Sequence, residues 1–542
     1  MTTMAEPADQ QIHDLLIIGT GSVGLTMAAT WARLGRSAVI ADKQEKLYGL
    51  PRVGHIDHEI MRVLQRLEAE GPTLEDAFPT EQYTWINAEG EKLLEFPWGE
   101  EGISGWHSAY LLNSAILERS LLECVEASPM ITRLPGWQAV GLTQHADHVE
   151  VVFERTRTAE GSSVPELIGE QRVLRGRYVV AADGANSLVR RLLGVDREDL
   201  GFNERWLVVD ARLKRPLRLA FDCGQICDPR RPTTVLPLGL SHRRWEWHLR
   251  PEEDAADFTP EAKAWELLGA LGVASEDVEL VRQLVYTFEA RLAHQWRVGR
   301  VFLAGDAAHT MPPFMGQGMC SGMRDALNLA WKLDLVLAGT APDSLLDTYQ
   351  LERHPHVRDW TLISIESGKV PCIIDPEAAR ERDEMFRAGY RPPMPDFPQL
   401  VEGIVHRVND TLAAPAGELG LQARVAAADG RVDLLDRFMP ADGFTLLSLA
   451  ADPATVLDDI QLRDLQRLGT TFIQLAPQGT PPAPGRLVDV EGTYARYLKQ
   501  YTADAVLVRP DFYVFGASQL AELPILVDDL LRQVLIGSLN PA

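Results

Sequence analysis

The order of apolar and polar positions predicts that the chain begins with a βαβ unit. Residues Asp14–Gly19 form a short apolar run that ends in glycine, which is typical of a buried parallel strand. Leu25–Leu34 then places apolar residues at helical spacing, and Ser37–Asp42 is a second apolar run. A strand, a helix and a further strand in this order indicate a parallel sheet with a helix on its face.

Strand patterns that lie far apart in the sequence indicate a discontinuous α/β domain. The apolar runs Arg177–Asp183 and Arg300–Asp306 each end in an acidic residue, and between them segments 205–250 and 280–292 alternate in a strand-like way. The simplest architecture is an α/β domain built from separated segments, with a β-sheet domain inserted into it. The first domain is predicted to comprise 1–80, 105–195 and 285–370, and the inserted domain 81–104 and 196–284.

The remaining pattern predicts two helices, a connection and a further domain. Gly322–Leu337 has a strong helical pattern, and a second helical stretch runs near Ser344–Ile365. Residues 371–400 are rich in proline and charge, so we interpret 371–430 as a connection. From about residue 430 the pattern becomes βα-like again, which predicts a compact α/β domain over 431–542.

Composition and charge narrow the class of protein. The 542 residues carry a net charge of −24, so the phosphate backbone of nucleic acid and anionic membranes are poor partners. The first 13 residues lack the basic start and apolar run of a signal peptide, and no apolar stretch reaches the ~18–20 residues that span a bilayer. We therefore expect a soluble, cytoplasmic protein.

Cysteine usage argues against disulfides and metal clusters. The chain has an odd number of scattered cysteines and no CxxC pair. They are Cys124, Cys223, Cys227, Cys320 and Cys372. A disulfide framework, a zinc cluster or a thioredoxin-type redox site would need paired cysteines, so we expect none of these and no bound metal.

The first chemical signal is the glycine pattern in Gly19–Gly24, which reads GTGSVG. Gly19 permits a tight turn after the strand, Gly21 lets the backbone approach a pyrophosphate, and Gly24 lets the helix pack closely on the strand. Asp42 ends the second strand near the ~20-residue spacing expected of a ribose-binding acid, and Lys43 follows it. Together these features predict a dinucleotide-binding site.

A second pattern favours FAD over NAD as that dinucleotide. Gly305–Gly318 follows an apolar run and precedes a helix, and it places Asp306 where a carboxylate can bind a ribityl hydroxyl. Gly316, Gln317 and Gly318 open the helix, followed by Met319. The positive end of a helix dipole there can stabilise the negative charge that reduced flavin carries.

A third pattern lies between the other two. The segment Asp183–Arg190 reads DGANSLVR, which alone would be an ordinary strand-to-helix turn with a capping aspartate. Its position between the two glycine motifs makes Asp183 a further candidate for cofactor binding.

In this order the three motifs resemble the single-component flavoprotein aromatic hydroxylases, which include para-hydroxybenzoate and phenol hydroxylases. The sequence is more closely similar to the 3-(3-hydroxyphenyl)propionate hydroxylases, and this similarity covers nearly the whole chain. It includes LVVD at 207–210, CDPRRP at 227–232, VYTFEARLA at 285–293, GMRDALNLAWKL at 322–333 and RPDFYV at 509–514.

The resemblance implies a fold and further contacts to the cofactor. It implies an α/β (α+β) fold with a Rossmann-like FAD-binding domain, an inserted β-sheet substrate domain and a C-terminal thioredoxin-like domain without redox cysteines. Arg52 matches the family's FAD-binding arginine, whereas Asn113 stands where glutamine is usual and is shorter. Ser22 replaces a frequent alanine or proline, and Asp42 keeps the carboxylate of a frequent glutamate.

The resemblance also implies a reaction. Such enzymes hydroxylate a phenolic ring with NAD(P)H and O₂ through a C4a-hydroperoxide of the reduced flavin, and a homodimer is compatible with the family. No second glycine fingerprint is present, so the nicotinamide would bind transiently, and NADH and NADPH remain alternatives. An FAD-dependent reductase or halogenase that shares the FAD domain is the alternative function, although Trp245 and Trp247 match a halogenase motif only faintly.

The substrate site is less well defined by the sequence. A base near the phenolic hydroxyl should help the reaction, but no residue identifies itself as that base. His309 and the backbone carbonyls of Pro312 and Pro313 are the candidate catalytic groups. The inserted sheet is expected to line the pocket with some of Trp245, Trp247, His248 and Phe221. A substrate carboxylate could bind among Arg230, Arg231, Arg243, Arg244 and Arg250. The resemblance implies a hydroxyphenyl-alkanoate or a related phenol as substrate, and this class includes bicyclic and polyketide rings.

Overall fold

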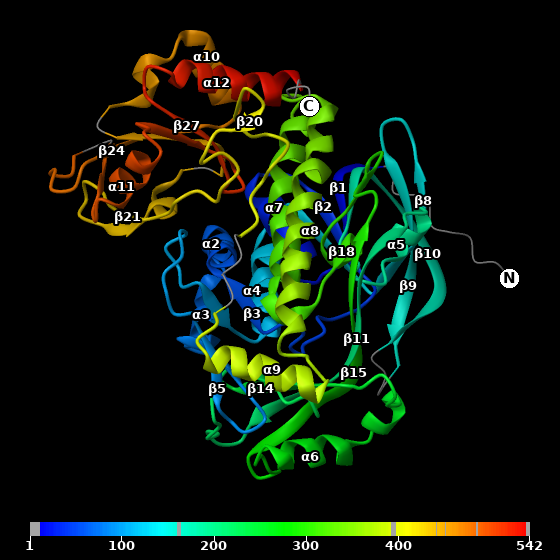
Figure 1. Cartoon of the computed structure of the whole chain (residues 1–542). Helices are drawn as coiled ribbons and strands as arrows, with labels where there is room; N and C mark the ends of the chain where they lie inside the picture. Colours follow the sequence, from blue (N-terminus) through cyan, green and yellow to red (C-terminus); the bar gives the residue numbers. More distant parts are fainter. Residues whose placement is uncertain are drawn as a thin grey trace.

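The structure is a computed structural model of the whole chain (Figure 1). It describes residues 11–159, 164–391, 397–440, 442–449, 451–483 and 486–537. Most of the predicted polar N-terminal segment and residues 392–396 of the proline-rich connection lie outside the described residues. Residues 538–542, at the end of the predicted C-terminal domain, also lie outside the described residues.

A parallel sheet forms the centre of the first part of the molecule. Its order is β16-β17-β10-β1-β2-β7, and β8 and β9 extend it through an antiparallel pairing of β9 with β10. The strands are β1 Ile12–Ile18, β2 Ala38–Asp42, β7 Ile131–Pro135, β8 Trp137–Gln144, β9 Val149–Thr158, β10 Pro165–Ala181, β16 Arg297–Val298 and β17 Val301–Leu303. The predicted βαβ unit is confirmed, because β1 pairs in parallel with both β2 and β10.

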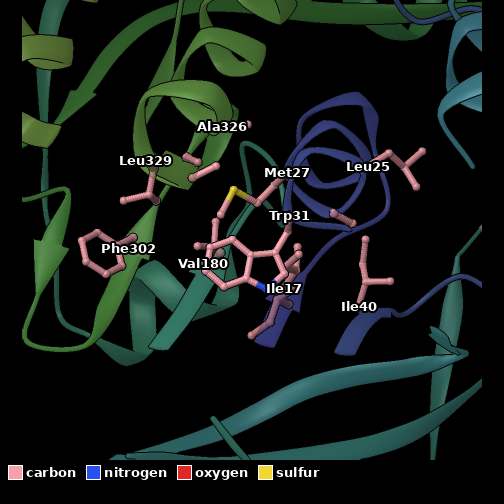
Figure 2. Packing of buried hydrophobic residues seen from close by; sticks show 14 of the residues in the cluster. Ile17, Leu25, Met27, Trp31, Ile40, Val180, Phe302, Ala326 and Leu329 are labelled. Carbon is pink, nitrogen blue, oxygen red and sulfur yellow. The ribbon is translucent and has the colours of Figure 1, made fainter. Parts of the chain in front are cut away.

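Helices cover this sheet and bury a continuous apolar core. They include α1 Ser22–Arg33, α2 His58–Leu67, α3 Glu70–Asp76, α4 Ser114–Ala127 and α5 Leu188–Leu192, and a short ribbon pairs β3 His55–Asp57 with β6 Ala109–Leu111. Figure 2 shows Trp31 of α1 packed among Ile17, Met27 and Val180. Trp31 is fully buried, and burying an apolar side chain of this kind is worth roughly 1.5–3 kcal/mol.

The second large sheet is mixed and mostly antiparallel. Its order is β18-β15-β11-β14-β13-β12-β4-β5. The strands are β4 Gln82–Ile86, β5 Lys92–Pro97, β11 Arg197–Leu213, β12 Gly224–Ile226, β13 Thr233–Leu238, β14 His242–His248, β15 Val278–Ala293 and β18 His309–Thr310. One face of this sheet packs on η1 Ala255–Phe258 and α6 Glu261–Ala270, which lies at the bottom of Figure 1.

Two long helices run through the middle of the molecule in Figure 1. They are α7 Gln317–Leu337 and α8 Thr348–Lys369, preceded by the short turns η2 Gly305–Ala307, η3 Pro313–Met315 and η4 Asp343–Asp347. Both predicted helices are present, and α7 begins at Gln317, within the glycine segment 316–318 that was expected to open it. The predicted connection also holds a helix, α9 Pro376–Arg387, which the sequence analysis missed.

The C-terminal part forms its own sheet, coloured yellow to red in Figure 1, with the order β22-β21-β25-β24-β23-β26-β27. Its strands are β21 Arg424–Ala426, β22 Val432–Leu434, β23 Thr445–Leu449, β24 Thr471–Ala476, β25 Leu487–Asp489, β26 Ala505–Val508 and β27 Val514–Ser518. Around it lie η5 Leu435–Phe438, η6 Pro453–Val456, α10 Asp459–Arg467, α11 Thr493–Gln500, α12 Leu523–Leu531 and η7 Arg532–Ile536. Parallel β23 and β24 beside antiparallel β26 and β27 give the predicted thioredoxin-like arrangement.

A buried ionic cluster joins this C-terminal sheet to α7 and α8. Glu352 of α8 accepts hydrogen bonds from both terminal nitrogens of Arg509, at 3.0 and 2.7 Å, and from Lys332 at 2.6 Å. Arg509 also binds Asp511. Buried charges are stable only when they are paired in this way, so the cluster fixes the C-terminal sheet against the two helices.

Among the described residues, no helix combines the length and the apolar character that crossing a membrane would require. The five cysteines, which all lie in the described part, are free.

Candidate FAD and substrate site

The loop between β1 and α1 has one open glycine and two closely packed ones. Gly19 has a φ of +111°, and a side chain there would overlap the carbonyl of Ala182. A Cβ on Gly24 would overlap the carbonyl of Gly19, whereas a Cβ on Gly21 would meet only Arg52 Nη2, at 3.7 Å. Gly21 therefore leaves open space, the Gly21 cradle, in front of the start of α1, which is where the glycine pattern predicts a pyrophosphate.

Asp42 braces this loop from the end of β2. Its carboxylate accepts hydrogen bonds from the backbone nitrogen of Thr20 at 2.6 Å, from the Thr20 hydroxyl at 3.0 Å and from the backbone nitrogen of Gln44 at 2.7 Å. The carboxylate is only half-buried and has acceptor capacity left for a ribose hydroxyl. Lys43 beside it is exposed.

Glu118 of α4 links two of the predicted cofactor contacts. Its buried carboxylate accepts hydrogen bonds from Ser22 Oγ and from Arg52 Nη2, each at 3.1 Å. Half of the Arg52 side chain remains exposed toward the Gly21 cradle, and its guanidinium lies 5.3 Å from the Tyr48 ring. The sequence analysis missed Glu118, although an acid on the apolar face of α4 between Leu117 and Leu121 was a usable signal.

Asn113 caps α4. Its side-chain oxygen accepts a hydrogen bond from the backbone nitrogen of Ala115 at 3.0 Å, as an N-cap residue does. Its side-chain nitrogen makes no hydrogen bond within the part of the chain that the structure describes, so the amide could still reach a cofactor. Asn113 therefore caps the helix in addition to the FAD contact that the family resemblance implies for this position.

The Asp183 turn is joined to the second glycine motif. The Asp183 carboxylate accepts hydrogen bonds from the backbone nitrogens of Leu188 at 2.8 Å and Val189 at 3.2 Å, and burial raises its pKa. Arg190 donates to the carbonyl of Ala307 at 2.8 Å and to that of Ala185 at 2.9 Å. These contacts hold the two motifs in fixed positions.

The second motif packs against the first through Val23. A Cβ on Gly305 would lie 2.9 Å from Val23 Cγ2, and one on Gly322 would lie 2.5 Å from the same atom. Asp306 follows Gly305, and its side chain is solvent-accessible although protein atoms surround it closely. Burial raises the Asp306 pKa, while His309, Arg52 and Arg197 act in the opposite direction. This carboxylate is accessible and suits a hydrogen bond to a ribityl hydroxyl.

The start of α7 exposes its backbone while its side chains turn inward. No side chain caps the helix at Gly316, and a Cβ on Gly318 would meet only Met311 Cγ, at 3.7 Å. Gln317 is buried, donates to Asp57 at 3.0 Å and accepts from Arg324 at 2.8 Å. Met319 belongs to the apolar core. The backbone amides at this helix start are the groups that could stabilise a reduced flavin.

Arg324 organises a buried ionic cluster beneath this helix start. It pairs with Asp57 and, at 2.6 Å, with Glu59. Burial alone would raise the pKa of Asp57, but the guanidinium outweighs it, so the pKa of this carboxyl lies well below its usual range. The sequence analysis quoted Arg324 as part of a family motif and gave it no role.

The candidate catalytic groups occupy different positions. His309 is fully buried, lies 2.7 Å from Asp325 and stacks on Trp296. A fully buried ring cannot touch substrate. The same Asp325 accepts a hydrogen bond from the backbone nitrogen of Gly305 at 3.0 Å, so the geometry favours a role for His309 in positioning the Gly305 loop. The carbonyl of Pro312 accepts a hydrogen bond from Ser364 Oγ at 2.7 Å. The carbonyl of Pro313 accepts one from the backbone nitrogen of Gly316 at 2.9 Å.

Comparison with known proteins gives the family of this chain. An FAD binding domain family matches residues 13–363, and an HcaD C-terminal domain family matches 417–533. A probable NADH-specific resorcinol 4-hydroxylase of Rhodococcus jostii is 35% identical and covers 98% of both chains. The 3-(3-hydroxy-phenyl)propionate/3-hydroxycinnamic acid hydroxylase of Escherichia coli K12 is 32% identical, over 94% of this chain and 92% of its own.

The chain belongs to the FAD-dependent aromatic hydroxylases. The monooxygenase PieE, solved with FAD and substrate, matches this fold with a TM-score of 0.76 at 21% identity, over 97% of this chain and 99% of its own. Aklavinone-11 hydroxylase, solved with FAD and aklavinone, matches with a TM-score of 0.74 at 24% identity and the same coverage. The family match and the two relatives above make the protein an FAD-dependent monooxygenase that hydroxylates an aromatic ring with O₂ and a nicotinamide as electron donor.

In this hydroxylase, the second sheet turns one face toward the flavin motifs and the other toward α6. Trp245 and Trp247 lie on the α6 face, where they are fully buried with Phe258, and Phe221 packs beside them. Of the four residues expected in the pocket, only His248 lies on the flavin-facing side, against Trp206. The expectation that some of the four residues line the pocket therefore narrows to His248.

Proposed function

We propose that this hydroxylase acts on an uncharged dihydric phenol of the resorcinol type, with NADH as the electron donor. The observation that carries the substrate proposal is that all five candidate arginines bind protein groups. Arg231 pairs with Glu253, Arg243 with Asp222 and Arg244 with Asp210. Arg230 pairs with Asp228, and Arg250 lies 3.8 Å from Glu252. A substrate carboxylate would have to displace one of these partners.

The relatives support the same choice. The chain is 35% identical to the relative named as an NADH-specific resorcinol hydroxylase and 32% identical to the hydroxyphenylpropionate hydroxylase. Because the two sequence identities differ little, 3-(3-hydroxyphenyl)propionate is the second candidate substrate. The donor proposal rests on the first relative's name.

We further propose which residues hold FAD. Gly19, Gly21, Ser22, Gly24, Asp42, Lys43, Arg52 and Asn113 would contact the adenosine and pyrophosphate half; Asp183, Gly305, Asp306, Pro313, Gly316, Gln317, Gly318 and Met319 would contact the riboflavin half. When bound, FAD would supply the activation of O₂. The carbonyls of Pro312 and Pro313 would border the substrate, and His309 would act through the Gly305 loop.

The broader arrangement follows the sequence-based division. The FAD-binding domain would comprise 1–80, 105–195 and 285–370, the substrate domain 81–104 and 196–284, the connection 371–430 and the thioredoxin-like domain 431–542. We propose a cytoplasmic enzyme that forms a homodimer, which sedimentation of the purified protein and fractionation of the source cells would test.

One experiment tests the substrate and the donor together. The FAD-loaded enzyme is offered resorcinol, phenol and 3-(3-hydroxyphenyl)propionate, each with NADH or NADPH under ¹⁸O₂. We expect NADH oxidation to accelerate most with resorcinol and one ¹⁸O atom to enter the product. A preference for the propionate would overturn the substrate proposal, and a preference for NADPH would overturn the donor proposal.

A further inference from the structure

The flavin-facing side of the second sheet carries a row of side chains on β14 that point the same way. In the pairing with β11, Arg244 lies opposite Asp210, Glu246 opposite Val208 and His248 opposite Trp206. Alternate residues of a strand share a face, so Arg244, Glu246 and His248 all point to the side away from α6.

Both ends of this row touch the loops that form the flavin site. Arg244 donates to the carbonyls of Arg52 at 2.9 Å and Pro51 at 3.1 Å. At the other end the ring of Trp206, beside His248, lies 6.0 Å from the ring of Phe314 in η3.

The two loops also contact each other. His55 Nδ1 lies 3.3 Å from the carbonyl of Gly316, which joins the loop that follows Arg52 to the start of α7. Glu246 is midway between the Arg244 end and the Trp206 end. Glu246 therefore lies on the flavin-facing side of the sheet, between the positions at which the two loops contact the row.

Glu246 is a buried acid with unused acceptor capacity. It is 4% exposed, and among the described residues its carboxylate makes no hydrogen bond. Its nearest cation is Arg244, at 3.7 Å, and that guanidinium already binds Asp210 at 2.7 Å. Burial raises the pKa of Glu246; Arg244 and Arg282 oppose this effect, and Asp210 adds to it. An unsatisfied buried carboxylate is a strong acceptor for an O–H group.

We propose that Glu246 is the base for the substrate, which binds the phenolic hydroxyl and takes its proton. This inference rests on the proposed function. The O–H bond breaks, its electron pair stays on oxygen as a phenolate, and the proton forms a carboxylic acid on Glu246. The phenolate raises the electron density of the ring carbons that form the new C–O bond. Glu246 returns the proton as the established reaction forms water, so no further reactant is needed.

Glu204 is the matched acid on the same face of the sheet. It lies near Trp206 Nε1 at 3.4 Å and His248 Nε2 at 3.6 Å, and burial raises its pKa as well. Unlike the carboxylate of Glu246, it accepts a hydrogen bond, from Trp206 Nε1, and its side chain is 31% exposed. Glu204→Gln is therefore the control for removing a carboxylate from this face.

The test compares Glu246→Gln and Glu204→Gln with the parent, all loaded with FAD and supplied with resorcinol. We expect Glu246→Gln to retain the FAD content and Tm of the parent but to hydroxylate about 100-fold more slowly, within the ~10²–10⁴ range of general base catalysis. The deficit should shrink as the pH rises toward about 10, where a phenol ionises without help. Arg244, Arg282, Asp210 and Tyr83 also face this carboxylate, and both variants retain them. Glu204→Gln should behave like the parent.

Several results would overturn the proposal. These are parent-like hydroxylation by Glu246→Gln, a deficit that does not change with pH, or the same deficit in Glu204→Gln. If Glu246→Gln fails to fold, Glu246→Asp retains a base one methylene further away. It should keep a measurable rate with the pH dependence of the parent, and a folded but inactive aspartate variant also counts against the proposal. A parent that hydroxylates no phenol would instead refute the proposed function.

Discussion

The carboxylate of Glu118 lies 3.1 Å from both the guanidinium of Arg52 and the hydroxyl of Ser22. One buried acid thus holds the arginine that faces the Gly21 cradle and the first residue of α1. The two contacts come from separate segments, so the shape of the pyrophosphate site depends on α4 as well as on the glycine loop.

Glu118→Gln should weaken FAD binding by about 10-fold or more. The amide can still accept from Ser22, but the charge-assisted bond to Arg52, worth ~1.5–3 kcal/mol, is lost. Fluorescence titration of the apoprotein with FAD measures the change. Glu126→Gln on the exposed side of α4, which pairs with Arg133, is the control. Equal FAD affinity in the two variants would contradict the role given to Glu118.

Asp306→Ala and Gly21→Val should impair FAD binding in different ways. The first removes a hydrogen bond of ~1.5–3 kcal/mol, which corresponds to roughly 10- to 150-fold weaker binding that excess FAD restores in part. The second fills the cradle beside Arg52, so added FAD cannot restore activity. The measurement is activity against FAD concentration. The placement of the cofactor would be refuted if Asp306→Ala bound FAD normally while FAD rescued Gly21→Val.

Gly322→Ala should destabilise the enzyme through Val23. The new Cβ would lie 2.5 Å from Val23 Cγ2 and 3.0 Å from Gly305 Cα. Overpacking of this kind costs ~1–3 kcal/mol in the free energy of unfolding. Urea denaturation of the single variants and of Val23→Ala/Gly322→Ala measures it. Recovery of stability in the double variant relative to Gly322→Ala is expected, and its absence would show that another contact is responsible.

Acid should destabilise the packing of the C-terminal sheet against α7 and α8, because it protonates the carboxylate of Glu352. Burial would raise the pKa of this carboxyl, but Arg509 and Lys332 outweigh it, and the folded-state pKa is lowered below the usual 4.5. A lowered folded-state pKa means that the stabilisation is fully present above about 4.5 and is lost as the pH falls below that value.

Glu352→Gln tests this pH dependence. Removing one partner of a buried ion pair costs ~3–5 kcal/mol, so the variant should have a lower Tm at neutral pH. Its Tm should also fall less steeply than that of the parent between pH 5 and 3. Parallel Tm curves for the two proteins would assign the acid sensitivity to other groups.

The sequence predicted the glycine contacts because they depend on local backbone geometry. Gly19 and Gly24 meet neighbours within one βαβ unit, and their spacing alone indicates that fit. Glu118 and Asp325 were missed because they act on residues brought close only by packing. Residue 118 lies 96 positions from Ser22.

The sequence could not say which of Trp245, Trp247 and His248 face the flavin motifs, for a similar physical reason. Alternation along β14 puts the two tryptophans on one face of the sheet and Arg244, Glu246 and His248 on the other. A period of two sorts side chains into two sets but does not say which set meets the cofactor domain. That depends on α6, whose apolar residues pack on the tryptophan side.

The ionic cluster at Glu352 has a consequence for engineering. Asn328, Trp331 and Lys332 of α7, which opens at the flavin motif, contact Asp511 or Glu352 within the same cluster. A chimera that takes its C-terminal domain from a relative would leave these charges opposite foreign partners. Successful domain grafts should therefore transplant the α7 and α8 positions together with Arg509 and Asp511, as one cassette.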